Sequence, residues 1–345
     1  MKFIRKIQHE SIVMSVSHVE MRDSMLQMIL PEGSSSLLAF FGILFAFGAT
    51  VLATAKLSPY LPKDAGREFA HDGKLSAGKP RGAGIIFVLA FVASVLLFSP
   101  LSAELVIYLL LIVVCMMTGF LDDASKTPWG EYKKGFLDLC VAALVAITFL
   151  KYNSNVVELA LFHVKFTLPP VVFAILTVIL VWTSVNVTNC SDGVDGLSGT
   201  LSIITIMSIY IVDRMKDVNE TYSFLILLFA VCILGYLWYN ATPSKLMMGD
   251  AGSRAMGLFI SIAILKSGCP FLFIPLALVL ILDGGLGLLK VSLLRFLKIH
   301  ILKNVRTPLH DHVRKVWDWS NTQTVFRFAI IQIILSLAVI YAMQL

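Results

Sequence analysis

Long apolar stretches separated by short polar segments constrain this chain more than any other feature. Ten such stretches occur in its 345 residues, at about 36–56, 83–102, 104–121, 136–150, 166–185, 194–212, 222–239, 254–268, 270–292 and 325–344. A helix needs roughly 20 residues to cross the hydrocarbon core of a bilayer, so ten crossings use about 200 residues and leave only short loops. The sequence therefore predicts an all-α, polytopic membrane protein with about ten transmembrane helices.

The composition supports a membrane protein over the soluble classes. Hydrophobic residues make up 57% of the chain, charged residues make up 14%, and the mean hydropathy is +0.84, whereas soluble domains contain about 45–50% apolar and about 25% charged residues. These values exclude a soluble enzyme, a large extramembrane domain, a disordered chain and a nucleic-acid-binding protein built on a basic domain. The five cysteines have no Cys-x-x-Cys or Cys/His spacing, which argues against a disulfide frame and against zinc.

Lys and Arg are distributed unequally between the two sets of loops. The loops associated with the first, third, fifth, seventh and ninth apolar stretches hold 17 Lys and Arg residues, and the other loops hold 5. Short loops rich in positive charge stay in the cytoplasm. We therefore expect the odd-numbered loops to face the cytoplasm and both termini to lie outside. Residues 1–35 lack the apolar core of a signal peptide and are interpreted as a tail, and residues 36–345 as a single transmembrane domain.

The residues that could carry chemistry follow the same odd-numbered stretches. They are Asp122 and Asp123 after the third, Asn189, Asp192 and Asp195 after the fifth, Gly249, Asp250 and Ser253 after the seventh, and His310, Asp311 and His312 after the ninth. Carboxylates and histidines placed at random would be spread over both faces. The sequence thus predicts an active site on the cytoplasmic face.

The first two acidic motifs each have a functional and a structural interpretation. Asp122 and Asp123 point about 100° apart on a helix, so one can meet a ligand while the other orients it, and Lys126 shares the face of Asp122 if the helix continues. Alternatively, they are a polar helix end among the headgroups. Asp192 and Asp195 are three residues apart and are expected to share a helical face. The glycines around them, Gly193 included, suit a nucleotide, or else helix capping and small-residue packing.

The last two motifs lie where phosphate and sugar could bind. Asp250 and Ser253 fit a helix start, which also stabilises phosphate, although plain capping is the alternative. Pro308 favours an extended chain, in which His310 and His312 point the same way. Oxygen donors without thiolates favour Mg²⁺, and Mg²⁺ with carboxylates, glycines and basic residues indicates phosphate-ester chemistry. Asp283, inside the ninth stretch, is either functional or a partner for a neighbouring helix.

Three motifs together resemble those of the polyprenyl-phosphate N-acetylhexosamine-1-phosphate transferases. GFLDD at 119–123, NCSDGVDGLSG at 189–199 and MGDAGS at 248–253 are similar, in order and spacing, to the three acidic motifs of that superfamily. PLHDH at 308–312 and WSNTQTVFRF at 319–328 resemble the ending of its phospho-N-acetylmuramoyl-pentapeptide transferase branch. The resemblance extends from about residue 36 to the C-terminus.

The resemblance implies a homodimer in the bacterial plasma membrane with its site facing the cytoplasm. Such an enzyme transfers phospho-MurNAc-pentapeptide from UDP-MurNAc-pentapeptide to undecaprenyl phosphate, a membrane lipid, and yields lipid I and UMP with Mg²⁺ as cofactor. By this resemblance Asp122, Asp123 and Asp250 are catalytic, Asp250 binds the metal, and Asp122 and Asp123 act on the lipid phosphate and its proton. The residues expected to bind substrate are Lys126, Lys134, Asn189, Asp192, Gly193, Asp195, Asn240, Ser253, His310 and His312.

The chain departs from the branch pattern at several positions, which keeps two alternatives open. Its residues 79–84 read KPRGAG, Asp311 interrupts a three-histidine run, and Met247 replaces an aromatic residue. The KPR segment is closer to the branch that uses UDP-GlcNAc, so a GlcNAc-1-phosphate transferase is one alternative. The other is an ion-coupled secondary transporter, which would place acids at the bilayer midplane on broken helices, whereas here all but Asp283 lie at span ends.

Overall fold

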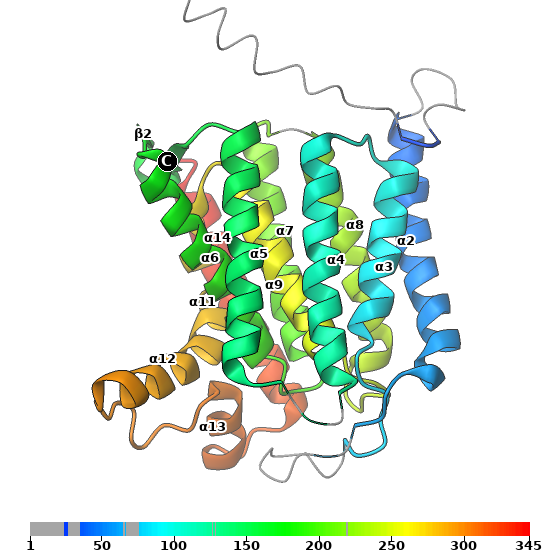
Figure 1. Cartoon of the computed structure of the whole chain (residues 1–345), viewed down its shortest axis with the longest axis vertical. Coiled ribbons are helices and arrows are strands. Elements are labelled where there is room, and N and C mark those ends of the chain that lie inside the picture. Colours follow the sequence, from blue (N-terminus) through cyan, green and yellow to red (C-terminus); the bar gives the residue numbers. More distant parts are fainter. Residues whose placement is uncertain are drawn as a thin grey trace, which may run out of the picture.

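The computed structural model describes residues 24–26, 35–64, 66, 76–125, 127, 129–218 and 220–345. Its long helices run side by side between two ends of a bundle (Figure 1). These helices are α2 (Ser35–Leu57), α3 (Gly84–Phe98), α4 (Ala103–Asp123), α5 (Glu131–Tyr152), α6 (Pro170–Cys190), α7 (Leu197–Met215), α8 (Glu220–Asn240), α9 (Gly249–Lys266) and α14 (Asn321–Ala342). The predicted tail, residues 1–35, lies almost entirely outside the described residues.

The structure confirms a polytopic helical membrane protein. Within the described residues, seven helices are long and apolar enough to cross a bilayer, and the number is eight if the bent pair Pro270–Leu276 and Leu278–Leu297 forms one span. The remaining two predicted spans correspond to α3, which has 15 residues, and α9, which carries three charged residues. Both run within the same bundle, so the count of ten stays a prediction.

The most buried helix is α9, in the middle of the bundle (Figure 1). Every residue from Ala251 to Leu265 is buried, and its main neighbours are α4 and α6. The outer helices α2 and α14 instead expose large apolar side chains, such as Phe41 and Ile334. Because apolar surface is stable against hydrocarbon, this exposure explains why the chain is more apolar than a soluble protein.

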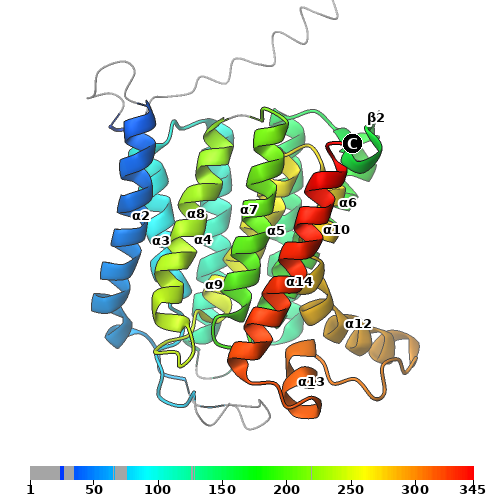
Figure 2. The same cartoon turned by 180° about the vertical axis from the view of Figure 1, so that it is seen from behind.

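The ninth predicted span is broken rather than continuous. It consists of η3 (Pro270–Leu272), α10 (Phe273–Leu276), α11 (Leu278–Leu280), the π-helix η4 (Ile281–Gly285), α12 (Leu286–Ser292) and the π-helix η5 (Leu293–Leu297). The two parts meet at an angle of 71°. Pro275 cannot donate a helical hydrogen bond, which favours a break at this place. As a result α12 projects sideways from the bundle (Figures 1 and 2).

Two further elements differ from the prediction. A short antiparallel hairpin joins β1 (Val156–Leu159) to β2 (Val164–Thr167), so the chain is not purely α-helical. The segment after Pro308, predicted to be extended, forms the helix α13 (Leu309–Val316). Proline restricts the residue that precedes it and is well tolerated at a helix start, so the extended conformation does not continue past Pro308.

One end of the bundle collects the segments that carry the motifs. The ends of α4, α6 and α8, the starts of α5, α7, α9 and α14, and the helix α13 all lie at the bottom of Figure 1. The start of α2 and the C-terminus lie at the opposite end. The predicted site residues that the structure describes are therefore on one side of the molecule.

Candidate active site

Glycines allow the start of α9 to pack directly against two other helices. A Cβ atom at Gly84, the first residue of α3, would collide with the backbone of Gly252. A Cβ atom at Gly119, near the end of α4, would collide with the backbone of Asp250. Because only glycine permits backbone contact this close, the ends of α3 and α4 are fixed beside Asp250.

The loop before α3 is paired with the loop before α9. Met247 donates a backbone hydrogen bond to the carbonyl of Pro80 at 2.8 Å, and Ala83 donates one to the carbonyl of Met247 at 3.0 Å. These bonds place Arg81, between the two paired residues, next to the first turn of α9. Gly82, with φ of +84°, supplies the left-handed conformation that the turn into α3 requires.

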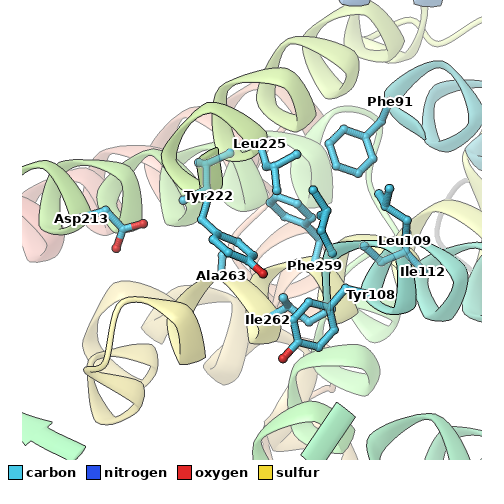
Figure 3. Close-up of a pocket in the computed structure, with 12 residues that line it drawn as sticks. Phe91, Tyr108, Leu109, Ile112, Asp213, Tyr222, Leu225, Phe259, Ile262 and Ala263 are labelled. Carbon is cyan, nitrogen blue, oxygen red and sulfur yellow. The ribbon is translucent and has the colours of Figure 1, made fainter. Parts of the chain in front are cut away.

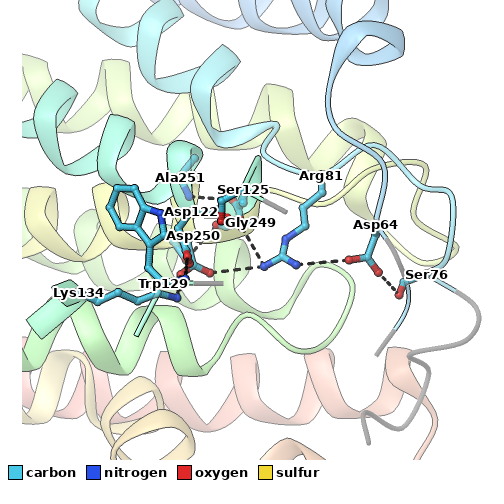
Figure 4. Close-up of polar contacts among 12 residues, drawn as sticks. Asp64, Ser76, Arg81, Asp122, Ser125, Trp129, Lys134, Gly249, Asp250 and Ala251 are labelled. Carbon is cyan, nitrogen blue, oxygen red and sulfur yellow. Dashed lines mark hydrogen bonds and ion pairs between the residues drawn. The ribbon is translucent and has the colours of Figure 1, made fainter. Parts of the chain in front are cut away.

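Two cations bridge three aspartates at this position (Figure 4). Arg81 Nη2 lies 2.8 Å from Asp123 Oδ1 and 3.8 Å from Asp250 Oδ1. Lys134 Nζ lies 3.3 Å from Asp250 Oδ2 and forms an ion pair with Asp122. We call Asp122, Asp123 and Asp250 the aspartate triad. Asp250 is its central member, because it contacts both cations.

The three carboxylates differ in exposure and in backbone contacts. Asp122 accepts a hydrogen bond from the amide of Trp129 at 2.7 Å, and Asp123 accepts one from the amide of Ala251 at 3.3 Å. The Asp123 side chain is 0% exposed, the Asp122 side chain 5% and the Asp250 side chain 14%. Asp250 is therefore the carboxylate that a ligand reaches most easily, while backbone contacts orient the other two.

Arg81 keeps its charge despite its burial. Desolvation lowers the pKa of its guanidinium, but attraction to Asp123, Asp250 and Asp64 outweighs desolvation and raises the pKa above its ordinary value. Asp64 lies 3.4 Å from Arg81 Nη1 and accepts a hydrogen bond from Ser76 at 2.6 Å. The loop is thus tied to the cation that it carries.

Asp192 and Asp195 do not share a helical face, which corrects the prediction. Helix α6 ends at Cys190 and α7 begins at Leu197, so both aspartates lie in the turn between them. Asp195 Oδ2 accepts a hydrogen bond from the amide of Ser244 at 3.1 Å and lies 3.9 Å from Lys79 Nζ. The turn is therefore joined to the loop before α9 and to the KPR segment.

Asn240 holds the same turn in place. Its Oδ1 accepts a hydrogen bond from the amide of Gly196 at 2.8 Å, and its Nδ2 donates one to the carbonyl of Leu246 at 2.9 Å. Gly196 has φ of +83°, a conformation that other residues rarely adopt. The structure thus gives Asn240 a positioning contact with two loops.

The two histidines point in different directions, because they belong to α13 rather than to an extended strand. The buried ring of His310 lies against Gly193, and its Nδ1 is 2.9 Å from Asp283 Oδ2. His312 Nδ1 instead accepts a hydrogen bond from the amide of Arg306 at 3.3 Å, and its ring contacts Trp317. Only His310 contacts another predicted motif.

The remaining predicted residues occupy less direct positions. Ser253 is buried and donates a hydrogen bond to the carbonyl of Gly249 at 3.0 Å, so its hydroxyl is bound within its own helix. Asn189 is half-buried in the last turn of α6. Lys126 lies outside the described residues. Among the described residues, Lys134 is the lysine that forms an ion pair with Asp122.

Two features of the site were not predicted from the sequence, namely the contact of Arg81 with the triad and a second, buried ion pair. Arg254 and Asp138 are 2% and 5% exposed and form an ion pair. This pair lies one helical turn further into the bundle than Asp250 and Lys134. On each helix the two charged residues are four apart, which places them on one face. That spacing was visible in the sequence, whereas nothing local indicated that Arg81 would meet the triad.

The described residues also enclose a small cavity at the opposite end of the bundle (Figure 3). Its volume is about 20 Å³, and Phe91, Tyr108, Asp213 and Phe259 contribute to its lining. A cavity of this size holds about one water molecule. It is too small to be a substrate site.

Comparisons with known proteins agree with the geometry. Residues 105–268, which include both the triad and the turn after α6, match the family described as Glycosyl transferase family 4. A phospho-N-acetylmuramoyl-pentapeptide-transferase from Treponema pallidum (strain Nichols) is 40% identical over 319 residues, which cover 87% of each chain. A relative of the same name from Clostridium acetobutylicum is 25% identical over 310 residues, or 86% of this chain and 96% of the relative. The chain belongs to the phospho-N-acetylmuramoyl-pentapeptide-transferase family.

Proposed function

We propose that this protein transfers phospho-MurNAc-pentapeptide from UDP-MurNAc-pentapeptide to undecaprenyl phosphate in the bacterial plasma membrane, giving lipid I and UMP. The observation that carries the proposal is the aspartate triad, bridged by Arg81 and Lys134 at one end of a membrane bundle. The names of the relatives support the transferred group. As the family resemblance implies, we also propose a homodimer.

The excess of Lys and Arg in the odd-numbered loops supports a cytoplasmic position for the site. A nucleotide-linked donor is made in the cytoplasm and a polyprenyl phosphate stays in the bilayer. A site at the end of the helices, at the level of the headgroups, lets the two substrates meet. The position of the triad at the end of α4 and the start of α9 supports this proposal.

In the proposed reaction an oxygen of the lipid phosphate attacks the sugar-bearing phosphorus of the donor. The bond from that phosphorus to the oxygen bridging the two donor phosphates breaks, and UMP leaves with the electron pair. Arg81 and Lys134 neutralise the phosphate charge. Asp122 or Asp123 takes the proton if the lipid phosphate arrives protonated.

The donor set at the triad fits Mg²⁺. Among the described residues no group of three His, Cys, Asp or Glu is arranged to hold a metal alone. Asp250 and Asp123 nevertheless contact the same guanidinium nitrogen, so a cation already sits between their oxygens. Mg²⁺ is commonly held by one or two carboxylates plus substrate phosphates. Asp250, with Asp123 as its neighbour, would hold the ion, which when bound supplies charge neutralisation for the diphosphate.

The other residues predicted to bind substrate lie at the same end of the bundle as the triad. Asn189 lies in the last turn of α6, and Asp192, Gly193 and Asp195 lie in the turn that follows it. These residues would contact the uridine nucleotide, and His310, against Gly193, would contact the sugar side. An apolar groove of about 400 Å³ lies between α6 and the bent span, with Phe173, Leu180, Phe273 and Ile274 in its lining. Such a surface suits part of a polyprenyl chain.

One assay tests the proposal against the alternative donor. Purified protein receives undecaprenyl phosphate, Mg²⁺ and either UDP-MurNAc-pentapeptide or UDP-GlcNAc, and UMP release is measured, with Asp250→Asn as the inactive control. We expect release with the first donor only. Release with UDP-GlcNAc alone would establish the GlcNAc-1-phosphate alternative. The absence of release with both donors would refute the transferase.

A further inference from the structure

Asp283 is an acidic residue with no assigned role in the proposed reaction. It lies in the π-helix η4 of the broken span and is 0% exposed. The neighbouring Gly284 packs so closely on the backbone of Val187 in α6 that a Cβ atom would not fit. Asp283 is thus held in place from the side of α6. A buried carboxylate is stable only when it is hydrogen-bonded or paired.

His310 satisfies both oxygens of this carboxylate. The backbone amide of His310 donates to Asp283 Oδ1 at 2.8 Å, and the ring Nδ1 lies 2.9 Å from Oδ2 and 3.1 Å from Oδ1. A carboxylate only accepts hydrogen bonds, so Nδ1 must carry the proton. Asp283 therefore determines both the orientation of the ring and the position of its proton.

The other ring nitrogen of His310, Nε2, faces Gly193 in the turn after α6. Nε2 is the atom nearest to the position that a Cβ at Gly193 would occupy, so glycine at 193 leaves room for the imidazole. Arg314 closes this arrangement, because its guanidinium donates to the carbonyl of His310 at 3.2 Å and to that of Gly193 at 3.4 Å. The ring is thus held edge-on at the turn that carries Asp192.

We propose that Asp283 is a positioning residue for His310, because it keeps the proton on Nδ1 and aims Nε2 at the donor substrate bound beside Gly193. The inference rests on the proposed transferase function. The sequence left open whether Asp283 is functional or pairs with a neighbouring segment. In this proposal it does both, because it binds His310 of α13 and thereby orients a residue of the site. The π-helix supports it, because the extra residue in the turn lets Asp283 reach α13, and such turns are frequent at functional sites.

Kinetics of a double-mutant cycle test the proposal. We expect Asp283→Asn and His310→Ala each to lower kcat about 10- to 100-fold, the range found when a carboxylate that orients a functional histidine is removed from a metal site. The two variants should match, because both remove the oriented imidazole. If Asp283 acts through His310, the double variant will be as slow as His310→Ala, within about twofold. Asp213→Asn is the matched control, because Asp213 is also 0% exposed but lies in the last turn of α7, at the end of the bundle away from the site. The kcat of this variant should equal that of the wild type.

A double variant much slower than His310→Ala, or a normal kcat for Asp283→Asn, would overturn the proposal. The position of the proton is tested without activity by ¹⁵N spectra of histidine-labelled wild-type protein, with His310→Gln used to assign the resonance. A protonated Nδ1 is expected, and an unprotonated Nδ1 would refute the inference even if a variant failed to fold. Loss of UMP release in the wild type would instead refute the proposed function and leave this spectroscopic result valid.

Discussion

At the scale of single residues, the site depends on charges that are held close together before any substrate binds. Arg81 and Lys134 lie between the three carboxylates of the triad, and Asp250 contacts both. Preorganised charges of this kind stabilise developing negative charge without rearrangement during the reaction. Substrate phosphates can then replace carboxylates as partners of the same cations.

Asp250→Asn should abolish most of the turnover. The change keeps the shape of the side chain but removes the charge between the two cations and the expected Mg²⁺ ligand. We expect a loss of at least about 1,000-fold, equivalent to about 4 kcal/mol of transition-state stabilisation. The measurement is Mg²⁺-dependent UMP release, with the exposed Asp217→Asn as control. The melting temperature should hardly change, and near-normal Mg²⁺-dependent release would disprove the metal assignment.

At the scale of elements, the broken ninth span depends on a side chain from another helix. Gln332 of α14 is 0% exposed, accepts a hydrogen bond from the amide of Val279 at 2.8 Å and donates one to the carbonyl of Leu276 at 2.9 Å. The break leaves these backbone groups without helical partners. Inside a membrane they must find a partner within the protein. Gln332 provides it for the amide of Val279, and it shares the carbonyl of Leu276 with the hydroxyl of Thr205, which donates at 3.0 Å.

Gln332→Leu should therefore destabilise the protein. Each buried backbone group left without a partner costs about 1–3 kcal/mol, so the melting temperature in detergent should fall by several degrees. Gln344→Leu, at the exposed C-terminal end, is the matched control and should leave it unchanged. An unchanged melting temperature for Gln332→Leu would show that the break does not depend on this contact.

A second contact between elements predicts how stability changes with pH. Burial alone would raise the pKa of Glu158 in β1, but hydrogen bonds from Lys216 and Lys165 outweigh burial and hold the pKa below its ordinary value. A carboxyl group with a lowered folded-state pKa stabilises the fold above its unfolded-state pKa of about 4.3, and this contribution is lost as the pH falls through the folded-state value.

The wild type should accordingly melt at a higher temperature than Glu158→Gln near neutral pH. The difference should be constant from about pH 6 to pH 8 and should shrink as the pH falls below about 4.3. Thermal denaturation of both proteins over this range is the measurement. A difference that persisted at low pH would mean that Glu158 stabilises the fold by packing rather than by charge.

At the scale of the whole molecule, the site occupies one end of the bundle and both the start of α2 and the C-terminus occupy the other (Figure 2). The unequal distribution of Lys and Arg predicts that the end with the site faces the cytoplasm. Membrane sidedness can be tested directly, because each end carries an exposed lysine that can be replaced by cysteine.

Cysteine labelling in intact cells tests this orientation. After the native cysteines are replaced, Lys303→Cys, exposed at the end with the site, should resist an impermeant thiol reagent. Lys165→Cys, whose side chain position is 68% exposed at the opposite end, should react readily. Labelling at 303 without labelling at 165 would reverse the orientation and separate the site from cytoplasmic nucleotides.

The sequence by itself determined the class of the fold and the face of the bundle that carries the acidic motifs. A membrane span is specified by the hydropathy of about 20 consecutive residues, so the positions of the helices follow from the local sequence. Each apolar stretch corresponds to a helix or a broken helix. Charged motifs at the ends of these stretches had to lie at the ends of helices. Asp122, Asp123 and Asp250 could therefore be assigned to one face from the sequence.

Only the tertiary structure decided which of these groups meet. Arg81 reaches the triad through backbone bonds between two loops that lie far apart in the sequence, and the bend of the ninth span depends on Gln332 in α14. Asp283 accepts hydrogen bonds from His310 of α13 because the bend brings the ninth span close to that helix. Each contact joins residues from distant segments through hydrogen bonds with strict geometry. Such a contact cannot be predicted from the local sequence of either segment.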